Sequence, residues 1–217
     1  MRKKLKRFAE NHSRDNIIQP GKPLYENVRG SWNSDYFKEE NPIVVELACG
    51  DGEYTVGLAQ AEPSCNYIGI DIKGDRLYQG STLAMEYDLT NVGFLRTQIH
   101  LLENFFDENE ISEIWLTFPD PRPRDRDEKR RLTHTRFLNM YKKLVRKDGW
   151  FKFKTDNTAL FDYTLEVLQN DFPVKNLEYT HDLYQTELVS DHYGIKTKYE
   201  RIWSEKGEKI KYLKFQF

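Results

Sequence analysis

IVVELACGDG, residues 43–52, is the stretch that decides the fold of this chain. It begins with a continuous apolar run, which is typical of a strand buried on both faces of a sheet. It ends in a turn that carries Gly50 and Gly52, and helical spacing of apolar residues follows over 54–61. Glycine lets a backbone turn tightly and approach a ligand without a Cβ clash. Strand, glycine turn and helix in this order predict the first unit of a parallel sheet, with a ligand crevice at the turn.

Downstream of this stretch, short apolar runs alternate with helical patterns. We expect further strands at 66–71, 92–97, 113–118 and 149–155, and helices at 75–89, 135–146 and 159–170. After residue 172 the order changes, and two strands at 173–180 and 209–217 enclose a short helix at 199–206. The sequence therefore predicts an α/β fold: a doubly wound, mostly parallel, Rossmann-like sheet with an antiparallel edge pair at the C-terminus.

Upstream of residue 42 the chain is polar and rich in turn-forming residues, so we expect residues 1–41 to be an N-terminal extension and 42–217 a single domain. The formal net charge is −2, so overall charge does not indicate a nucleic-acid partner. The first seven residues nevertheless form a basic arm able to contact phosphates: Arg2, Lys3, Lys4, Lys6 and Arg7. A solvated chain end is the alternative interpretation of that arm.

The two cysteines, Cys49 and Cys65, provide neither a disulfide framework nor metal-ligand spacing, and none of the five histidines has such spacing. No apolar run reaches the ~18 residues of a membrane span. The N-terminus lacks the apolar stretch of a secretory signal. We therefore expect a cytoplasmic protein without a metal, in contact with no membrane.

Acidic side chains accompany the glycine turn. Glu46 lies at the end of the first strand, and Asp71 ends the second, where a carboxylate commonly accepts hydrogen bonds from ribose hydroxyls. The G-x-G-x-x-G pattern of dinucleotide binders is absent because Thr55 stands at the third glycine position. Glu46 suits a cofactor with an amino-acid group, such as S-adenosylmethionine. An ordinary strand-to-helix turn, with Asp71 as a surface turn residue or helix cap, is the alternative.

The charged loop TFPDPRPRDRDEKRR, residues 117–131, follows the fourth strand. Loops at the carboxyl ends of parallel strands line the ligand crevice. Asp120 stands between Pro119 and Pro121, which restrict the backbone and hold its carboxylate in place. The arginines and lysines that follow can bind phosphates, although a loop whose charges pair among themselves is also consistent with the sequence.

Three separated motifs carry a resemblance to a known family. FPDPRPRDRDEKRR at 118–131, FKTDN at 153–157 and TKYE at 197–200 resemble, in the same order, motifs of the tRNA (guanine-N7)-methyltransferases. The resemblance extends over residues 43–217 and implies a class I methyltransferase fold. Arg122, Asp125 and Asp127 depart from the family's usual tryptophan, lysine and histidine. These departures concern how the loop meets RNA.

The resemblance implies that the chain transfers a methyl group from S-adenosylmethionine to N7 of a guanine in the variable loop of tRNA. It implies cofactor contacts by Glu46, Gly50, Gly52, Asp71, Gln98 and Asp120, and substrate contacts by Arg124, Asp156, Thr197 and Glu200. Guanine N7 has a lone pair and no proton, so no general base is required. Our hypothesis is that Asp120 and Asp156 are the catalytic pair, which stabilises the positive charge developing on the purine.

Several alternatives stay open on the sequence. Asp156 also has the spacing of a helix N-cap, and Thr197 with Glu200 has that of a capping box. The whole chain is also compatible with a methyltransferase of a small molecule or protein, or with a non-catalytic RNA-binding scaffold of the same fold. A monomer and a homodimer are equally compatible with the sequence.

Overall fold

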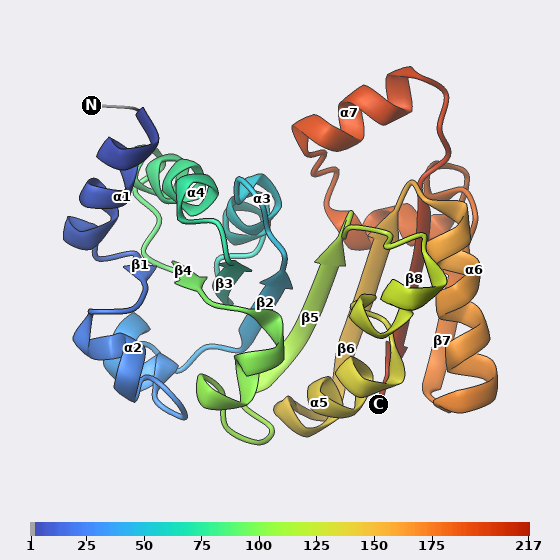
Figure 1. The fold of residues 1–217 in the computed structure, drawn as a ribbon, viewed down its shortest axis with the longest axis horizontal. Helices are drawn as coiled ribbons and strands as arrows, with labels where there is room; N and C mark the ends of the chain where they lie inside the picture. Colours follow the sequence, from blue (N-terminus) through green and yellow to red (C-terminus); the bar gives the residue numbers. More distant parts are fainter. Residues whose placement is uncertain (1–2) are drawn as a thin grey trace.

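The computed structural model describes residues 3–217, which form one eight-stranded sheet in the order β1-β4-β3-β2-β5-β6-β8-β7 (Figure 1). All neighbouring strands are parallel except that β8 runs antiparallel to both β6 and β7. The mostly parallel sheet with an antiparallel C-terminal pair is therefore confirmed. The strands are β1 Ile17–Ile18, β2 Ile43–Leu47, β3 Asn66–Asp71, β4 Val92–Arg96, β5 Ile111–Thr117, β6 Val145–Thr155, β7 Lys175–Thr180 and β8 Lys211–Gln216.

Helices cover both faces of the sheet. The α-helices are α1 Lys3–Ser13, α2 Pro23–Asn27, α3 Glu53–Ala61, α4 Gly74–Glu86, α5 Thr135–Leu144, α6 Thr158–Glu166 and α7 Lys198–Glu205. Short 3₁₀ turns lie at Ile99–Asn104, Asp125–Arg130, Leu183–Gln185 and Glu187–His192, and π-helical turns at Trp32–Phe37 and Val167–Asp171.

Alternation along each strand divides the apolar side chains between two cores. In β2, Val45 and Leu47 face the core that includes α5 and α6, whereas Val44 faces the core that includes α3 and α4. Every residue of β2 is buried, as the continuous apolar run predicted. The central strand is thus enclosed on both sides, and this fixes the position of the turn that follows it.

The N-terminal extension lies against the domain. Its strand β1 pairs with β4, and the Trp32 indole, fully buried, donates to the Phe105 carbonyl at 2.8 Å. Helix α1 packs on α4, where the Arg14 guanidinium lies 3.7 Å from the ring centre of Tyr78. Of the basic arm, Arg2 lies outside the described residues, as do the side chains of Lys3 and Lys4.

Helix α5 ends two residues earlier than predicted. Val145 is buried and pairs with Ile111 in β5, so β6 begins where the helix had been expected to continue. Periodicity alone does not separate a last helical turn from the first residues of a strand. The carboxyl ends of β2, β5 and β6 meet at one edge of the sheet, and α7 lies beyond that edge (Figure 1).

Candidate active site

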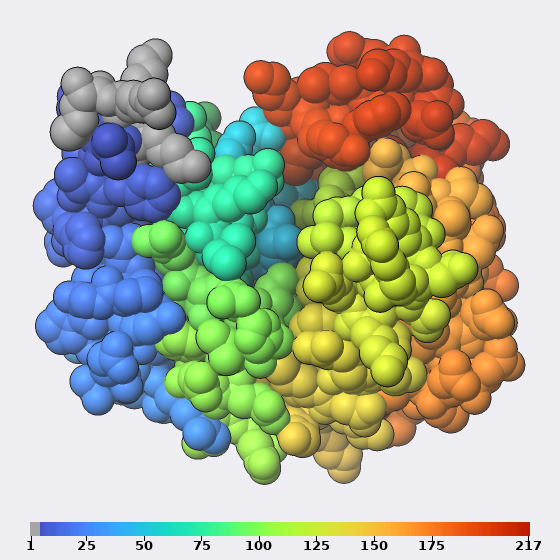
Figure 2. Space-filling model, in the orientation of Figure 1, coloured from blue at the N-terminus to red at the C-terminus, as the bar shows by residue number. Residues whose placement is uncertain are grey.

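A cavity of about 620 Å³ opens at this edge of the sheet. Figure 2 shows the corresponding hollow between α7, in red, and the blue-green residues of α3 and α4. Its walls come from four parts of the chain: the end of β2 with the turn that follows it, the start of α4, the loop after β5, and the start of α7. The lining residues are Glu46, Ala48–Asp51, Glu53, Lys73, Arg76, Thr117–Pro121, Thr197–Tyr199 and Ile202. The volume and the convergence of polar groups are typical of a small-molecule site.

The turn after β2 contains three residues in the left-handed region, Ala48, Gly50 and Gly52, with φ of 56°, 57° and 74°. Gly50 lines the cavity, and Gly52 does not. A Cβ on Gly52 would lie 2.7 Å from Phe94 Cε1 and 2.8 Å from the Gly80 Cα. Gly52 is therefore required for close packing of the turn on α4 and β4, whereas Gly50 has no Cβ that would occupy the cavity it lines.

Glu46 is the buried carboxylate at the base of the cavity. Its oxygens accept hydrogen bonds from the hydroxyls of Thr55 and Thr117. Burial raises the pKa of Glu46 to about 7, although these two hydrogen bonds and the charge of Lys154 act in the opposite direction. A buried carboxylate that is costly to ionise favours a ligand that brings positive charge.

Asp71 supports the same turn from β3. One oxygen accepts from the Gly50 amide at 3.2 Å and the other from the Lys73 amide at 2.8 Å. The side chain thus ties β3 to the glycine turn and retains unused acceptor capacity. Gln98, at the end of β4, is exposed and does not line the cavity.

The loop after β5 brings Asp120 to the rim of the cavity. Its side chain is 63% exposed and forms an ion pair with Arg122 Nε at 3.2 Å. Arg122, which replaces the family's tryptophan, has a left-handed φ of 47° and also donates its amide to Asp120 at 3.2 Å. Arg124 is exposed and precedes the 3₁₀ turn. Both proline-flanked Asp120 and the basic loop therefore face solvent beside the cavity.

Asp156 follows β6, the strand next to β5, and is partly buried. Asn157, not Asp156, caps α6 by accepting from the Leu160 amide at 2.8 Å. The capping alternative for Asp156 is therefore wrong. Burial raises the pKa of Asp156. Burial, and after it the charge of Asp156, raises the pKa of Tyr199, a cavity residue. Asp156 thus lies near the cavity but not in its wall.

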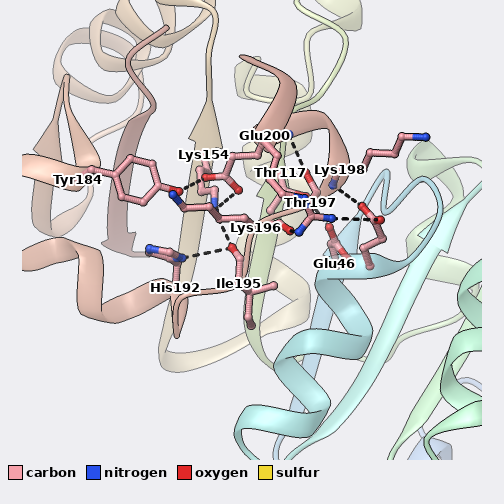
Figure 3. A network of polar contacts seen from close by, with 12 residues as sticks. Glu46, Thr117, Lys154, Tyr184, His192, Ile195, Lys196, Thr197, Lys198 and Glu200 are labelled. Carbon is pink, nitrogen blue, oxygen red and sulfur yellow. Dashed lines mark hydrogen bonds and ion pairs between the residues drawn. The ribbon is translucent and has the colours of Figure 1, made fainter. Parts of the chain in front are cut away.

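Thr197 and Glu200 have different surroundings. The Thr197 hydroxyl accepts from the Glu200 amide at 3.1 Å and caps α7, while also lining the cavity. The Glu200 side chain does not complete a capping box. It is fully buried, 2.9 Å from Lys154 Nζ, and accepts a hydrogen bond from the Tyr184 hydroxyl (Figure 3). Glu200 is not among the residues that line the cavity.

Sequence reasoning assigned no role to Lys154 or Tyr199. Lys154 is 0% exposed, but Lys152 and Lys154 alternate with Phe151 and Phe153 in β6, so no sequence signal marked the second lysine as buried. Tyr199, in contrast, is 47% exposed at the cavity wall, with its ring tilted against Phe118 at a centroid distance of 5.5 Å. A single exposed aromatic residue in a helix forms no sequence pattern that would mark it as a site residue.

Comparison with known proteins identifies the family to which this chain belongs. Residues 40–213 match a family model described as putative methyltransferase. The tRNA (guanine-N(7)-)-methyltransferase of Cytophaga hutchinsonii is 50% identical over all of this chain and 98% of its own length. This chain belongs to the tRNA (guanine-N7)-methyltransferase family. The member from Bacteroides fragilis is 43% identical over 98% of this chain and 84% of its own length.

Solved structures agree on the fold of this tRNA (guanine-N7)-methyltransferase family member. The 16S rRNA methyltransferase KamB superposes with a TM-score of 0.64 at 13% identity, covering 88% of this chain and 94% of that one. A structure described as an antibiotic-related methyltransferase gives a TM-score of 0.62 at 18% identity, covering 85% and 91%. The class I methyltransferase fold is thereby confirmed.

Two further expectations concern what the chain lacks. Within residues 3–217, no group of three or more histidine, cysteine or acidic side chains is arranged to hold a metal ion. Over the same residues, no helix is both long enough and apolar enough to cross a membrane.

Proposed function

We propose that this chain transfers the methyl group of S-adenosylmethionine to N7 of a guanine in tRNA, in the variable loop. The observation that carries the proposal is the single cavity in which the glycine turn, the FPDP loop and the TKYE segment meet. The FPDP loop and the TKYE segment are two of the three motifs by which the sequence resembled the family, and the full-length relatives extend the match over the whole chain.

The residues of the cavity fit the cofactor. S-adenosylmethionine supplies an electrophilic methyl group on a sulfonium and carries an ammonium, a carboxylate and a ribose diol. Glu46, buried and able to accept further hydrogen bonds, suits a cationic group. The first amides of α3 suit the carboxylate, because no side chain caps this helix. Asp71, which supports the glycine turn, and the Gly50 backbone would hold the ribose end, and Gln98, which lies outside the cavity lining, is proposed to meet the adenine.

Catalysis at N7 depends mainly on positioning, because the nucleophile needs no deprotonation. Asp120, on the cavity rim, and Asp156, near Tyr199, are the carboxylates that we assign to the guanine. Carboxylates accept hydrogen bonds from guanine N1–H and the exocyclic amine, which selects guanine over adenine. They also stabilise the positive charge that the purine gains as its N7 is methylated.

Basic side chains around the opening suit an RNA backbone. Lys73 and Arg76 line one side of the cavity and Lys198 the other, and Arg124 stands on the exposed loop. Lysine and arginine at these positions bind phosphates and position the nucleotide without reading its sequence. We therefore propose that tRNA lies across the opening, with the target guanine turned into the cavity.

The test uses Asp120→Asn and Asp156→Asn as separate variants. Purified protein is incubated with labelled cofactor and unmodified tRNA, and the nucleosides are then analysed. We expect 7-methylguanosine from the wild type and a loss of rate on the order of 100-fold in each variant. Asp148→Asn is the matched control, because Asp148 is exposed near the other end of β6.

Unchanged rates in both variants would remove the assigned pair. Label that stays in a small molecule or in protein would instead support a different methyl acceptor. Absence of any transfer, together with no cofactor binding by calorimetry, would indicate the non-catalytic scaffold. Cytoplasmic location, and a monomer or homodimer as the working unit, remain predictions from the sequence.

A further inference from the structure

A buried ion pair joins two of the family motifs. Lys154, from FKTDN on β6, and Glu200, from TKYE on α7, are each 0% exposed, and Lys154 Nζ lies 2.9 Å from Glu200 Oε2. Figure 3 shows the two side chains pointing toward each other, with Tyr184 beside them. The sequence separates these residues by more than forty positions. Their contact is therefore a tertiary link between the sheet and α7.

Lys154 is held on several sides. Its ammonium lies 4.8 Å from the ring centre of Tyr54 and 5.8 Å from that of Phe118. Its backbone carbonyl accepts from the Phe118 amide at 2.8 Å. Phe118 begins the loop that carries Asp120, so one residue contacts both that loop and α7. Two segments of the cavity wall, the loop after β5 and α7, therefore share Lys154 as a support.

Helix α7 has a second anchor on the other side of the cavity. The Lys198 amide donates to Glu53 Oε2 at 2.6 Å, and Arg201 lies 3.9 Å from the same carboxylate. Glu53 opens α3, immediately after the glycine turn. The first turn of α7 is thus connected to β6 through Glu200 and to α3 through its own backbone.

A buried ion pair is a poor source of stability, since removing both charges from water costs about as much as their attraction returns. Well-packed apolar side chains in the same space often stabilise a fold equally well. They do not, however, tie one side chain of a helix to a defined place, as the ion pair and the Tyr184 hydrogen bond tie Glu200. The pair and the Tyr184 hydroxyl define where Glu200 must lie, and hence where Thr197 and Tyr199 face.

We propose that Lys154 and Glu200 are positioning residues that form a clasp, which holds α7 over the cavity so that Thr197 and Tyr199 meet the substrate. The proposal rests on the methyl transfer proposed above and deepens it. It assigns Glu200 a role through α7 instead of direct contact with the guanine. It assigns Lys154 the same positioning role, through its ion pair with Glu200.

The double variant Lys154→Met/Glu200→Leu tests the clasp, because it removes both charges and leaves neither unpaired. Three quantities are measured: the urea midpoint, hydrogen exchange of the amides at 198–206, and kcat and KM for tRNA. We expect a fold that still unfolds cooperatively, exchange in α7 faster by about tenfold or more, and kcat lower by about 100-fold. The KM for tRNA should change less than kcat, because most of the side chains proposed to bind phosphates, Lys73, Arg76 and Arg124, lie outside α7.

The matched control is Lys152→Met/Glu113→Leu. This pair also joins β6 to its neighbour, at 2.8 Å with side chains 12% and 21% exposed, but lies outside the cavity. We expect it to leave α7 exchange and kcat as in the wild type. An equal loss of kcat in this control would attribute the effect to general damage and overturn the clasp.

Two results with the test variant also overturn the proposal. One is unchanged kcat, and the other is a lower kcat with α7 exchange unchanged, which indicates that Glu200 acts on the substrate directly. If the double variant does not fold, Glu200→Gln, which retains the size and the Tyr184 hydrogen bond, is measured in the same way with the same criteria. Failure of the wild type to methylate guanine N7 would contradict the proposed function, while α7 exchange would still test the clasp.

Discussion

Replacing Gly52 and Gly50 by alanine, one at a time, tests whether the two glycines of the turn after β2 have different tasks. In Gly52→Ala, the new Cβ would lie 2.7 Å from Phe94 Cε1 and 2.8 Å from the Gly80 Cα. Overpacking of this kind costs about 1–3 kcal/mol. The left-handed φ of 74° adds roughly 1–2 kcal/mol for a residue with a Cβ.

Gly50→Ala has only the cost of placing a Cβ at a left-handed φ, without the overpacking. Its φ is 57°, and the nearest atom to a new Cβ is Arg76 Nη1 at an ordinary 3.8 Å. Ala48 has a similar φ of 56° in the same turn, so the fold accommodates alanine in this conformation. In both variants alanine lowers the entropy of the unfolded chain, which offsets about 0.4–1 kcal/mol. The free energy of unfolding should therefore differ between the variants by the overpacking cost, about 1–3 kcal/mol.

Cofactor affinity should fall more in Gly50→Ala than in Gly52→Ala, the reverse of the order expected for stability. A methyl group at Gly50 enters the cavity, so we expect S-adenosylmethionine to bind about tenfold more weakly, a change of roughly 1.4 kcal/mol. Gly52 does not line the cavity, and folded Gly52→Ala should bind as the wild type does. Urea unfolding at constant m-value and titration calorimetry measure the two effects. Equal destabilisation, or weaker binding only in Gly52→Ala, would refute the division of tasks.

Two further predictions concern charged groups at the cavity. Burial raises the pKa of Glu46 to about 7 from an ordinary 4.5, so its contribution to stability is complete below about pH 4.5 and is lost as the pH rises through about 7. A cationic ligand favours the ionised form, so cofactor affinity measured by calorimetry should increase between about pH 6 and about pH 8, and Glu46→Gln should flatten this dependence. Arg122→Ala removes an ion pair to Asp120 whose side chains are 42% and 63% exposed. Because solvent screens such a pair, urea unfolding should show a change below about 1 kcal/mol, and a larger loss would contradict the exposed position of this loop.

Periodicity was sufficient for the central sheet because its strands are buried on both faces. The run at 66–71 and the strand observed there agree residue for residue. The structure of the N-terminal extension could not be predicted from its sequence. Its strand β1 has only two residues, and the pairing of β1 with β4 is a contact between distant parts of the chain. No sequence pattern marked the position of helix α1, because its side chains are mostly polar. Its place depends on contacts with α4 such as that of Arg7 with Tyr78.

The candidate site shows the same limit. Glu46, Gly50 and Asp120 were identified because each stands at the end of a strand or in a turn, where sequence position determines spatial position. The burial of Glu200 was not predictable, because the TKYE spacing equally fits a capping box. Its partner Lys154 lies in another motif, and only the tertiary structure brings the two together.

The two outer strands of the sheet affect how copies of this protein meet. An unpaired strand edge is a template for joining a second chain, and natural proteins limit this with very short or charged edge strands. Here β1 ends one side after two residues, and β7 presents Lys175 and Glu178 on the other. Neither border offers a long apolar edge for continuing the sheet into a neighbour. A homodimer of this protein should therefore form through helices or loops, and crowding in concentrated solution should not lead to strand-by-strand aggregation.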